Sequence, residues 1–351
     1  GFCVPSMEWP VLQTAVDAAL KRSGEVVIVA DIVVERTVAI TTPSAVLTLR
    51  RAPGLTVRPR ISCTSGAVLS IISPEGCVRI GEIGLHCSAE HCATIEADAK
   101  PGPGAAEGAR CLVTVEDCEI TCARGDGVRV AGTTQLRLRR TRIDGCRGYA
   151  VYAAGRDTEV TAVDCTMSRC TAGVGVGQDA SVWLRGCKVL DCEKDGVRLV
   201  DRSHIVMRQC EVSGCGTAGL ALRGQGRWEN PDQRVITQCC IQRNRFGVVL
   251  EDSWCTWGEG NLVQGNVDGP TGQPQDFVTE DDSGLVMGFD WSDPDAGATV
   301  GVAAVAPVRR GAAVRVDMCN GQGWVRFQEV DTGTYGFAPI AAGDGLGTTA
   351  T

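Results

Sequence analysis

Apolar and polar residues alternate in short runs along the middle of the chain, and the runs recur every 22 to 24 residues. Each repeat carries a Cys-x-Ile-x-Cys or closely similar segment followed by Gly-Val-x-Val, as in residues 118–130 and 187–199. Alternation with a period of two predicts strands whose side chains point inward and outward in turn. Three short strands in about 23 residues leave no room for a crossover helix, so each repeat predicts one turn of a parallel β-helix.

Equivalent residues of such repeats stack about 4.8 Å apart, and this predicts two inward columns of cysteines. The first contains Cys87, Cys122, Cys146, Cys170, Cys192 and Cys215 and ends in Asn244; the second contains Cys118, Cys165, Cys187, Cys210 and Cys239 and is interrupted at Thr141. Stacked cysteines point the same way, which is poor geometry for a disulfide. The columns therefore predict buried thiols and a cytoplasmic protein, with a partly disulfide-bonded protein as the alternative.

The two ends of the chain follow other patterns. Trp9-Pro10 predicts the start of a helix that ends at Ser23-Gly24, with Val11, Leu12, Ala15, Val16, Ala19 and Leu20 on one face. Gly- and Pro-rich runs predict loops at 96–110 and 224–233, and the period stops after Asn266. The predicted organisation is all-β: a capping helix (1–24), a right-handed parallel β-helix (25–268), an acidic linker (269–283), a small β-barrel (284–342) and a tail (343–351).

The opening VLQTAVDAALKRSGEVVIV and the cysteine repeats, over residues 9–266, resemble the right-handed β-helix superfamily. That superfamily includes pectate lyases, polygalacturonases and the carbohydrate-binding-and-hydrolysis repeats, which also occur in non-enzymatic adaptor and scaffold proteins. The tail from Leu285 resembles a Src-homology-3-type barrel, through MGFDW, VRRGAAVRV and GWVRFQEVDTGTYGFAP. This second resemblance implies a groove for proline-rich peptides, and the alternative is a barrel that only caps the solenoid. The groove would be lined by Phe289, Trp291, Trp324 and Pro339.

Enzymes of the superfamily resemble one another in their paired carboxylates on adjacent turns, a Gly-His-Gly motif, or an acidic calcium cluster with a basic residue nearby. The chain has three histidines, His86, His91 and His204, and neither motif. The outward positions of the Gly-Val-x-Val strands contain no row of acids: they are Arg129, Tyr152, Gly175, Arg198, Ala221 and Val249. No catalytic residue is predicted.

Three further groups of residues have a functional and a structural interpretation. His86-Cys87 and His91-Cys92 have nearly the spacing of half a zinc site, but Cys87 falls on the inward column, so no metal and no cofactor are predicted. Arg137 and Arg139 lie outward on one strand and form either a face for an acidic partner or a solvated surface. Asp126, Asp144 and Asp195 occupy turns, where carboxylates bind backbone amides.

Charge and hydropathy limit the partners. A net charge of −8 argues against nucleic acid, and the absence of an 18-residue apolar run argues against a membrane span. The favoured function is a non-catalytic scaffold for protein partners in an intracellular assembly, cytoskeletal or ciliary for example. The alternative is a secreted polysaccharide lyase or hydrolase, whose partner would be carbohydrate.

Overall fold

The computed structural model describes most of the chain up to residue 339. Outside the described residues lie 6–10, 23, 101–107, 225–233, 259, 273–276, 281–283, 290–300, 308–312, 320–323, 330–334 and 340–351. For Trp254, and for residues after 276 other than Val278, only the backbone is described. The chain divides into two compact units, Gly1–Trp183 and Leu184–Thr351, with the boundary inside strand β20 (Ser181–Arg185).

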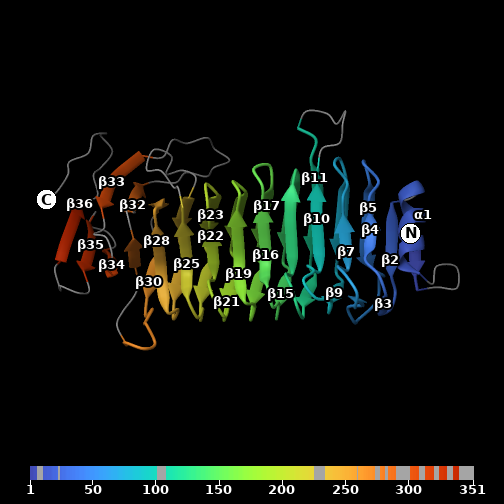
Figure 1. Cartoon of the computed structure of the whole chain (residues 1–351), viewed down its shortest axis with the longest axis horizontal. Helices are drawn as coiled ribbons and strands as arrows, with labels where there is room; N and C mark the ends of the chain where they lie inside the picture. Colours follow the sequence, from blue (N-terminus) through green and yellow to red (C-terminus); the bar gives the residue numbers. More distant parts are fainter. Residues whose placement is uncertain are drawn as a thin grey trace. The chain divides into compact units, whose positions relative to one another are not determined.

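Unit 1 is a coil of three parallel sheets in which β1 pairs with β2 and, from β2 onward, each strand pairs with the strand three places later in the chain (Figure 1). Sheet A1 contains β1 (Phe2–Val4), β2 (Glu25–Ile28), β5 (Val46–Arg51), β8 (Cys77–Gly81), β11 (Cys111–Glu116), β14 (Thr134–Arg139), β17 (Glu159–Val163) and β20. Sheet B1 contains β3 (Ile32–Val34), β6 (Arg60–Cys63), β9 (Gly84–Cys87), β12 (Glu119–Cys122), β15 (Arg142–Asp144) and β18 (Thr166–Ser168). Sheet C1 contains β4 (Val38–Ile40), β7 (Leu69–Ile71), β10 (Ile95–Ala99), β13 (Val128–Gly132), β16 (Tyr149–Ala154) and β19 (Ala172–Gly177).

Unit 2 has the same three-sheet arrangement, and the parts of the three sheets that belong to it are called A2, B2 and C2. Sheet A2 contains β23 (His204–Arg208), β26 (Arg234–Thr237), β29 (Trp254–Trp257), β32 (Gly284–Phe289) and β33 (Gly301–Pro307). Sheet B2 contains β21 (Lys188–Leu190), β24 (Glu211–Ser213), β27 (Cys240–Gln242) and β30 (Leu262–Gln264). Sheet C2 contains β22 (Val197–Leu199), β25 (Ala218–Arg223), β28 (Phe246–Glu251), β31 (Phe277–Glu280), β34 (Ala313–Cys319), β35 (Trp324–Glu329) and β36 (Tyr335–Pro339). The predicted parallel β-helix is thereby confirmed.

From β8 onward, the chain turns each corner between an A and a B sheet of the coil through one residue in the left-handed conformation. In unit 1 these residues are Glu82, Asp117, Arg140 and Asp164, with φ between 44° and 58°. In unit 2 they are Gly186, Gln209, Gln238 and Gly260. A single positive φ redirects the backbone without a long loop, and stacking on the next turn supports the residues that are not glycine. These corners keep the strand register constant.

The cysteine columns lie inside the coil. In unit 1, Cys63 pairs in register with Cys87 and Cys87 with Cys122, and all three are fully buried, as are Cys146 and Cys170. The column therefore begins one turn earlier than the sequence predicted. Burial raises the pKa of the Cys118 thiol in the second column to about 11, because the thiolate would lose its hydration. None of the cysteines in the described part of the chain forms a disulfide.

Polar residues replace cysteine where a corner needs a hydrogen bond. Thr141, which interrupts the second column, donates from Oγ1 to the carbonyl oxygen of Arg139 at 3.0 Å. In unit 2 the first column continues from Cys215 through Asn244 to Asn266, one turn beyond the predicted end. The Asn244 amide Nδ2 donates to Asn266 Oδ1 at 3.0 Å, and Asn244 Oδ1 accepts the Cys215 N–H at 2.9 Å. Asparagine thus fits a buried corner where its amide is fully bonded.

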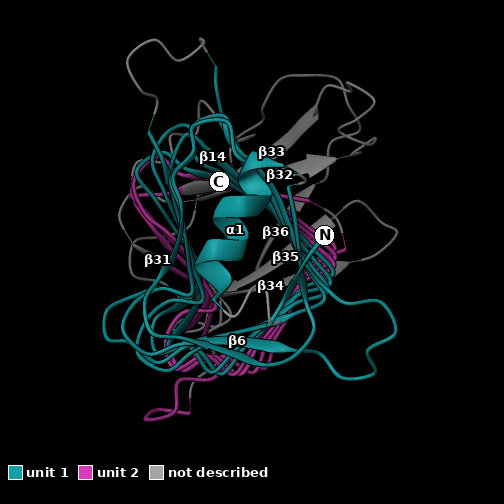
Figure 2. Ribbon diagram, turned by 90° about the vertical axis from the view of Figure 1, so that its right-hand side faces the viewer, with its two compact units in different colours: residues 1–183 teal, residues 184–351 magenta. Residues whose placement is uncertain are grey.

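The N-terminal helix α1 runs from Leu12 to Lys21 and lies across the end of unit 1, where Figure 2 shows it inside the outline of the coil. Its buried residues are Leu12, Ala15, Val16 and Ala19, which confirms most of the predicted apolar face. Val11 is 53% exposed, so its placement on that face was wrong: it precedes the helix and points away. Gly24 ends the helix with φ 65° and donates its N–H to the Ala19 carbonyl oxygen at 2.7 Å.

Two predicted segments differ from the structure. The predicted loop at 96–110 begins too early, because residues up to Ala99 form β10; the Gly-Pro-rich run that follows had concealed the strand. Strand β31 falls inside the predicted linker and pairs in parallel with β28. Farther on, β32 pairs in parallel with β29, whereas β33 to β36 pair antiparallel. The predicted barrel stays a prediction.

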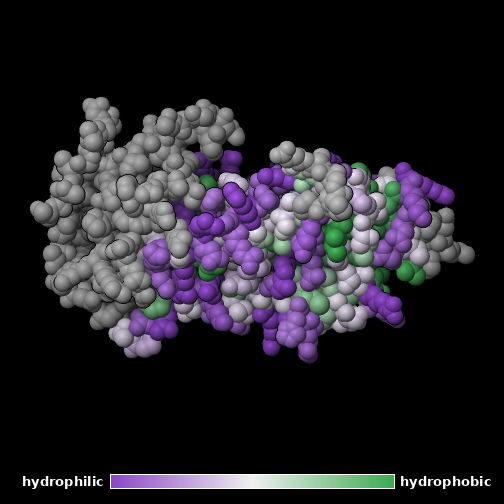
Figure 3. All heavy atoms as spheres, turned by 45° about the horizontal axis from the view of Figure 1, so that its top comes forward, coloured by the Kyte–Doolittle hydropathy of each residue, from purple (hydrophilic) through white to green (hydrophobic). Residues whose placement is uncertain are grey.

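Hydrophilic side chains predominate on the face that Figure 3 shows, and its hydrophobic residues form small separate patches. No helix in the described residues is long and apolar enough to cross a membrane.

Candidate functional site

The outer surface of sheet C1 brings together aromatic, acidic and basic side chains from three consecutive strands. We call it the tyrosine–carboxylate face; its members are Glu96, Asp98, Asp126, Arg129, Tyr149 and Tyr152. Strand pairing aligns Glu96 with Arg129 and Arg129 with Tyr152, so these three residues form one outward row along the coil. The inward neighbours of this row are fully buried valines and isoleucine, which fix the strands beneath it.

The two tyrosines form a platform at the centre of the face. Their ring centroids are 5.2 Å apart and the ring planes meet at 36°. Gly175, the next residue of the row, leaves space for the Tyr149 ring: a Cβ atom at Gly175 would lie 2.5 Å from Tyr149 Cε1. The glycine is therefore required by a close approach of the ring, and the platform depends on it.

Asp126 and Arg129 hold each other rigidly at the edge of this platform. The Asp126 carboxylate is 5% exposed; its Oδ1 accepts the Tyr149 N–H at 2.7 Å. Its Oδ2 accepts two hydrogen bonds from Arg129, from Nε at 2.9 Å and Nη2 at 2.7 Å. Burial works to lower the pKa of Arg129, but the bonds to Asp126 outweigh it and raise that pKa. The guanidinium is a permanent, oriented cation.

Turn chemistry, which the sequence predicted for three aspartates, is confirmed for Asp126 and Asp195. Asp195 Oδ1 accepts the Ala218 N–H at 3.2 Å in unit 2. Asp144 differs, because its carboxylate binds side chains: Ser168 Oγ donates at 2.8 Å and Arg169 Nε at 2.9 Å. Hydrogen bonding from Arg169 lowers the pKa of Asp144, although burial opposes it. All three are structural anchors.

Glu96 and Asp98 are the acidic residues that sequence reasoning missed. Both point outward from β10, whose inward residues Ile95, Ala97 and Ala99 are buried. Glu96 Oε1 accepts the Ala93 N–H at 3.1 Å, and Asp98 Oδ2 lies 3.5 Å from Lys100 Nζ. Asp98 Oδ1 is inaccessible to solvent and has no hydrogen-bond partner among the described residues. The alternation in IEADA was the available signal, and the nearby Gly-Pro-rich run concealed it.

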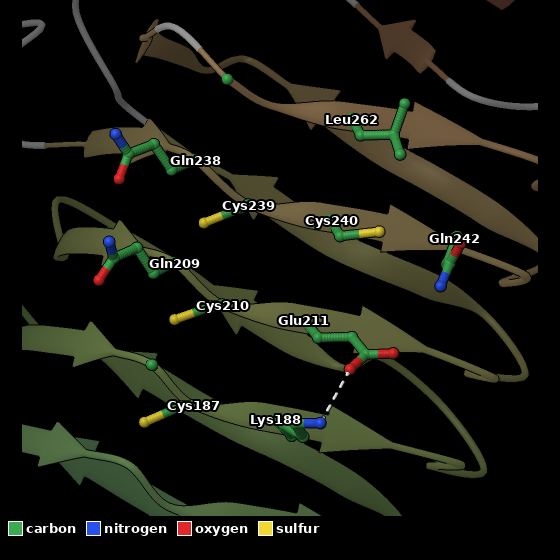
Figure 4. Close-up of a pocket in the computed structure, with 12 residues that line it drawn as sticks. Cys187, Lys188, Gln209, Cys210, Glu211, Gln238, Cys239, Cys240, Gln242 and Leu262 are labelled. Atoms are coloured by element: carbon green, nitrogen blue, oxygen red, sulfur yellow. Dashed lines mark ion pairs between the residues drawn. The ribbon is translucent and has the colours of Figure 1, made fainter.

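A hollow of about 560 Å³ with a mixed polar and apolar lining lies on the outer side of sheet B2. Figure 4 shows Gln209 and Gln238 stacked on successive turns at its edge, with Lys188, Glu211, Cys240 and Leu262 on the strands beside them. Its one carboxylate, Glu211 Oε2, lies 3.5 Å from Lys188 Nζ and is neutralised. The hollow can hydrogen-bond a polar ligand, but it offers no pair of acids.

The structure does not assemble the half zinc site. His86 and Cys87 are neighbours on strand β9, so their side chains lie on opposite faces: Cys87 is buried, while His86 Nδ1 lies 2.7 Å from Thr121 Oγ1 outside. Within the described ranges, no three His, Cys, Asp or Glu side chains come together to hold a metal. Strand alternation is the reason that sequence spacing misleads here.

The remaining predicted residues divide into two groups. Arg137 and Arg139 are exposed on the outer surface of β14, as the alternation predicted. Trp291 lies outside the described residues, and Phe289, Trp324 and Pro339 belong to strands β32, β35 and β36, whose side chains are not described. The peptide groove stays a prediction.

Comparison with known proteins supports the fold. Residues 105–273 match the family model described as the right-handed beta helix region. None of the curated protein sequences compared matches the chain. Among solved structures, full-length tailspike protein 2 from Escherichia coli O157:H7 bacteriophage CAB120 superposes with a TM-score of 0.52 at 12% identity, over 78% of this chain and 39% of that one.

Two further structures are similar at lower scores. The enzymatically active domain of bacteriophage CBA120 tailspike protein 2 has a TM-score of 0.49 at 12% identity, with 82% of this chain and 41% of that chain covered. A pectate lyase has a TM-score of 0.35 at 12% identity, with 79% and 71% covered. The chain thus spans about two-fifths of the length of the tailspikes it resembles. The likeness to full-length tailspike protein 2 supports the parallel β-helix fold and nothing beyond the fold.

Proposed function

We propose that this protein binds an extended polysaccharide on the tyrosine–carboxylate face and cleaves it as a lyase or hydrolase. One observation carries the proposal: two contacting tyrosine rings stand beside outward acids and a fixed arginine on consecutive strands of one sheet. The interaction scaffold, favoured by sequence reasoning, has less support, because the family model and the tailspike likeness concern the β-helix fold and nothing described points to a peptide groove.

Binding would use both parts of the face. Tyrosine rings pack on the apolar C–H surface of sugar rings, and their hydroxyl groups can hydrogen-bond. Arg129 is preoriented by Asp126 and can donate to sugar oxygens or a carboxylate without losing side-chain freedom on binding. Because successive turns repeat along the coil, successive sugars would contact Tyr152, Arg129 and Glu96 in turn.

Cleavage would use Glu96 and Asp98. Residues two apart on a strand have Cα atoms about 6.6 Å apart, which permits the carboxyl separations of about 5 to 9.5 Å found in glycosidases. The Asp98 side chain is 46% exposed and its oxygen Oδ2 lies 3.5 Å from Lys100 Nζ, so we assign Asp98 the role of base, which takes a proton from the attacking water or from a sugar carbon. Glu96 is then the acid that protonates the departing glycosidic oxygen.

The test is turnover by three single variants on a panel of pectate, polygalacturonate, alginate, chondroitin and neutral glucans. We expect Asp98→Asn and Glu96→Gln to lower kcat by about a hundredfold or more and keep KM. Tyr152→Ala should instead raise KM. Both reactions create reducing ends, and unsaturated products identify elimination.

A matched control removes an acid of the other unit. Glu211→Gln changes charge equally but alters a carboxylate already paired with Lys188, so turnover should stay at the wild-type level. Absence of any product from every polysaccharide, or equal turnover by Asp98→Asn and Glu211→Gln, contradicts the enzymatic proposal. Binding without turnover would leave a carbohydrate-binding protein in its place.

Two finer features of the architecture belong to the same proposal. Helix α1 packs its buried face on the first strands of unit 1, and we propose that it caps the coil. The tail resembles a small barrel in sequence, and we propose that it forms one beyond β32. Removal of either should expose unpaired strand edges and promote aggregation.

A further inference from the structure

A second surface of unit 1, the outer side of sheet A1, carries a row of alternating arginines and threonines. Strand pairing aligns Thr48, Arg79, Thr114, Arg137 and Thr161 on successive turns. The Ser181 N–H donates to the Thr158 carbonyl oxygen at 3.0 Å, which continues the ladder and sets Trp183 beside Thr161. Together with Arg139 on the neighbouring row, these residues define the arginine strip.

The large side chains of the strip are exposed. Arg79, Arg137 and Arg139 are exposed, and Trp183 is 39% exposed, one of the few large apolar side chains at the surface. The threonines between them are half-buried, so the arginines and the indole stand above a shallow polar floor. An exposed tryptophan in a polar row is a common mark of a contact surface.

The three guanidiniums lack counter-charges although acids lie close by. Glu116 pairs in register with Arg139, yet its carboxylate is bound to Arg140 instead. Glu159 is one turn from Gln135 and is bound to Arg110 and Gln135. Among the described residues, no carboxylate is within ion-pair distance of the three strip arginines, whereas Arg50 and Arg51 of the same sheet and Arg140 at the corner after β14 are all paired. An acidic chain thus keeps three free cations on one surface.

Their spacing indicates the kind of ligand. Arg79, Arg137 and Trp183 occupy every second turn of one row, so neighbouring members are about 9.6 Å apart, twice the strand separation. In an extended glycan, alternate sugars present the same side. A chain lying along the strip would therefore bring acidic groups to Arg79 and Arg137 and a sugar face to Trp183, in register with the coil.

We propose that the arginine strip is a binding site for an extended anionic polysaccharide, distinct from the tyrosine–carboxylate face and independent of whether that face is catalytic. Guanidinium groups bind carboxylate and sulfate oxygens in similar geometry, and Trp183 adds selectivity for sugar over other polyanions. The strip holds polymer by charge and stacking and performs no chemistry.

The test compares two triple variants of equal charge. Arg79→Gln/Arg137→Gln/Arg139→Gln should weaken binding of polygalacturonate by about tenfold at low salt, and should flatten the dependence of affinity on salt, because fewer counterions are released. The control, Lys21→Gln/Arg36→Gln/Arg156→Gln, removes three exposed cations elsewhere in unit 1 and should change affinity less than about twofold. Circular dichroism establishes that both variants are folded.

Other ligands show which chemical groups of the polymer the arginine strip recognises. Dextran sulfate binding as tightly as polygalacturonate would assign the strip to sulfate and carboxylate alike, and unsubstituted dextran should not bind. Trp183→Ala should weaken polygalacturonate binding but not the binding of double-stranded DNA, whose bases are already stacked on one another and cannot pack on the indole. Equal losses in the two triple variants, no binding by the wild type, or DNA bound as tightly as polygalacturonate would overturn the proposal. Turnover at the other face has no bearing on these outcomes.

Discussion

The outer surfaces of sheets C1 and C2 are built from similar Gly-Val-x-Val strands and differ in chemistry. In unit 1 the outward row carries Glu96, Arg129 and Tyr152, all of which have polar groups at the surface. In unit 2 the row begins with the half-buried Arg198 and changes to Ala221 and Val249, which are buried in an apolar cluster with Ala218, Phe246 and Val278. The inward residues of both rows are buried and apolar: valine, isoleucine and alanine in unit 1, and valine and leucine in unit 2.

This difference separates stability from function. The inward positions must fill a narrow interior at every turn, so they tolerate little variation. The outward positions have no such requirement, and each unit uses them differently: one displays charge and aromatic rings, and the other buries alkyl groups. The following experiments, in order of decreasing effect, test how complete the separation is.

The largest effect is expected from truncating the interior equally in both units. Ile120 and Ile241 occupy the same position at the centre of a B-sheet strand and are both fully buried. Either residue changed to alanine should lower the free energy of unfolding by about 2 to 5 kcal/mol, since it leaves a cavity. Denaturant titration measures it. If only one of the two substitutions lowered the free energy of unfolding, the interiors of the two units would not be equivalent.

The next effect is on binding and should occur in unit 1 alone. Tyr152→Ala should weaken polysaccharide binding by about 2 kcal/mol, roughly thirtyfold, because the ring is a central anchor of the face. Phe246→Ala removes an aromatic ring from the outer side of sheet C2 and should leave affinity unchanged. Isothermal titration calorimetry with the bound polysaccharide measures both affinities. Equal losses of affinity in the two variants would refute the assignment of the site to unit 1.

A smaller effect depends on pH. The pKa of Asp144 is lowered in the folded state by Arg169, so its stabilisation is present above the unfolded pKa of about 3.9 and disappears as the pH falls through the lower folded value. Asp144→Asn should cost about 1 kcal/mol at pH 7 and nothing in strong acid.

The matched site in unit 2 has no acid. Ser213 occupies the equivalent corner and accepts a hydrogen bond from Arg243 Nη2 at 3.4 Å. Ser213→Ala should therefore alter stability by the same amount at every pH. If the Ser213 variant lost stability in a pH-dependent way, the loss of stability in acid would not arise from Asp144.

The smallest effect is expected for the arginine strip. Arg139→Gln should change the free energy of unfolding by no more than about 0.5 kcal/mol, because this exposed guanidinium has no partner among the described residues. A larger loss, seen in thermal unfolding, would give the strip a structural role and weaken the case for a ligand.

The sequence by itself determined the coil, the cysteine columns and most of the buried face of α1. These features are local or periodic: inward and outward positions alternate within each strand, and a constant repeat length carries the same residue to the same place on the next turn. It also placed Arg137 and Arg139 on an outer surface. The column ends at Cys63 and Asn266 were missed, because the repeat there departs from the cysteine pattern.

Only the tertiary structure brought Glu96 and Asp98 beside Arg129 and Tyr152, and Trp183 beside Thr161. An outward residue takes its neighbours from other turns, and the Gly-Pro-rich run after β10 breaks the repeat length on which the alignment depends. The ion pairs also depend on the tertiary structure, because several arginines lie near the same carboxylate. Glu116 pairs with Arg140, and Arg139 therefore stays available for a ligand. Periodicity fixes where a side chain points, whereas the chemistry it can perform depends on what the next turn places against it.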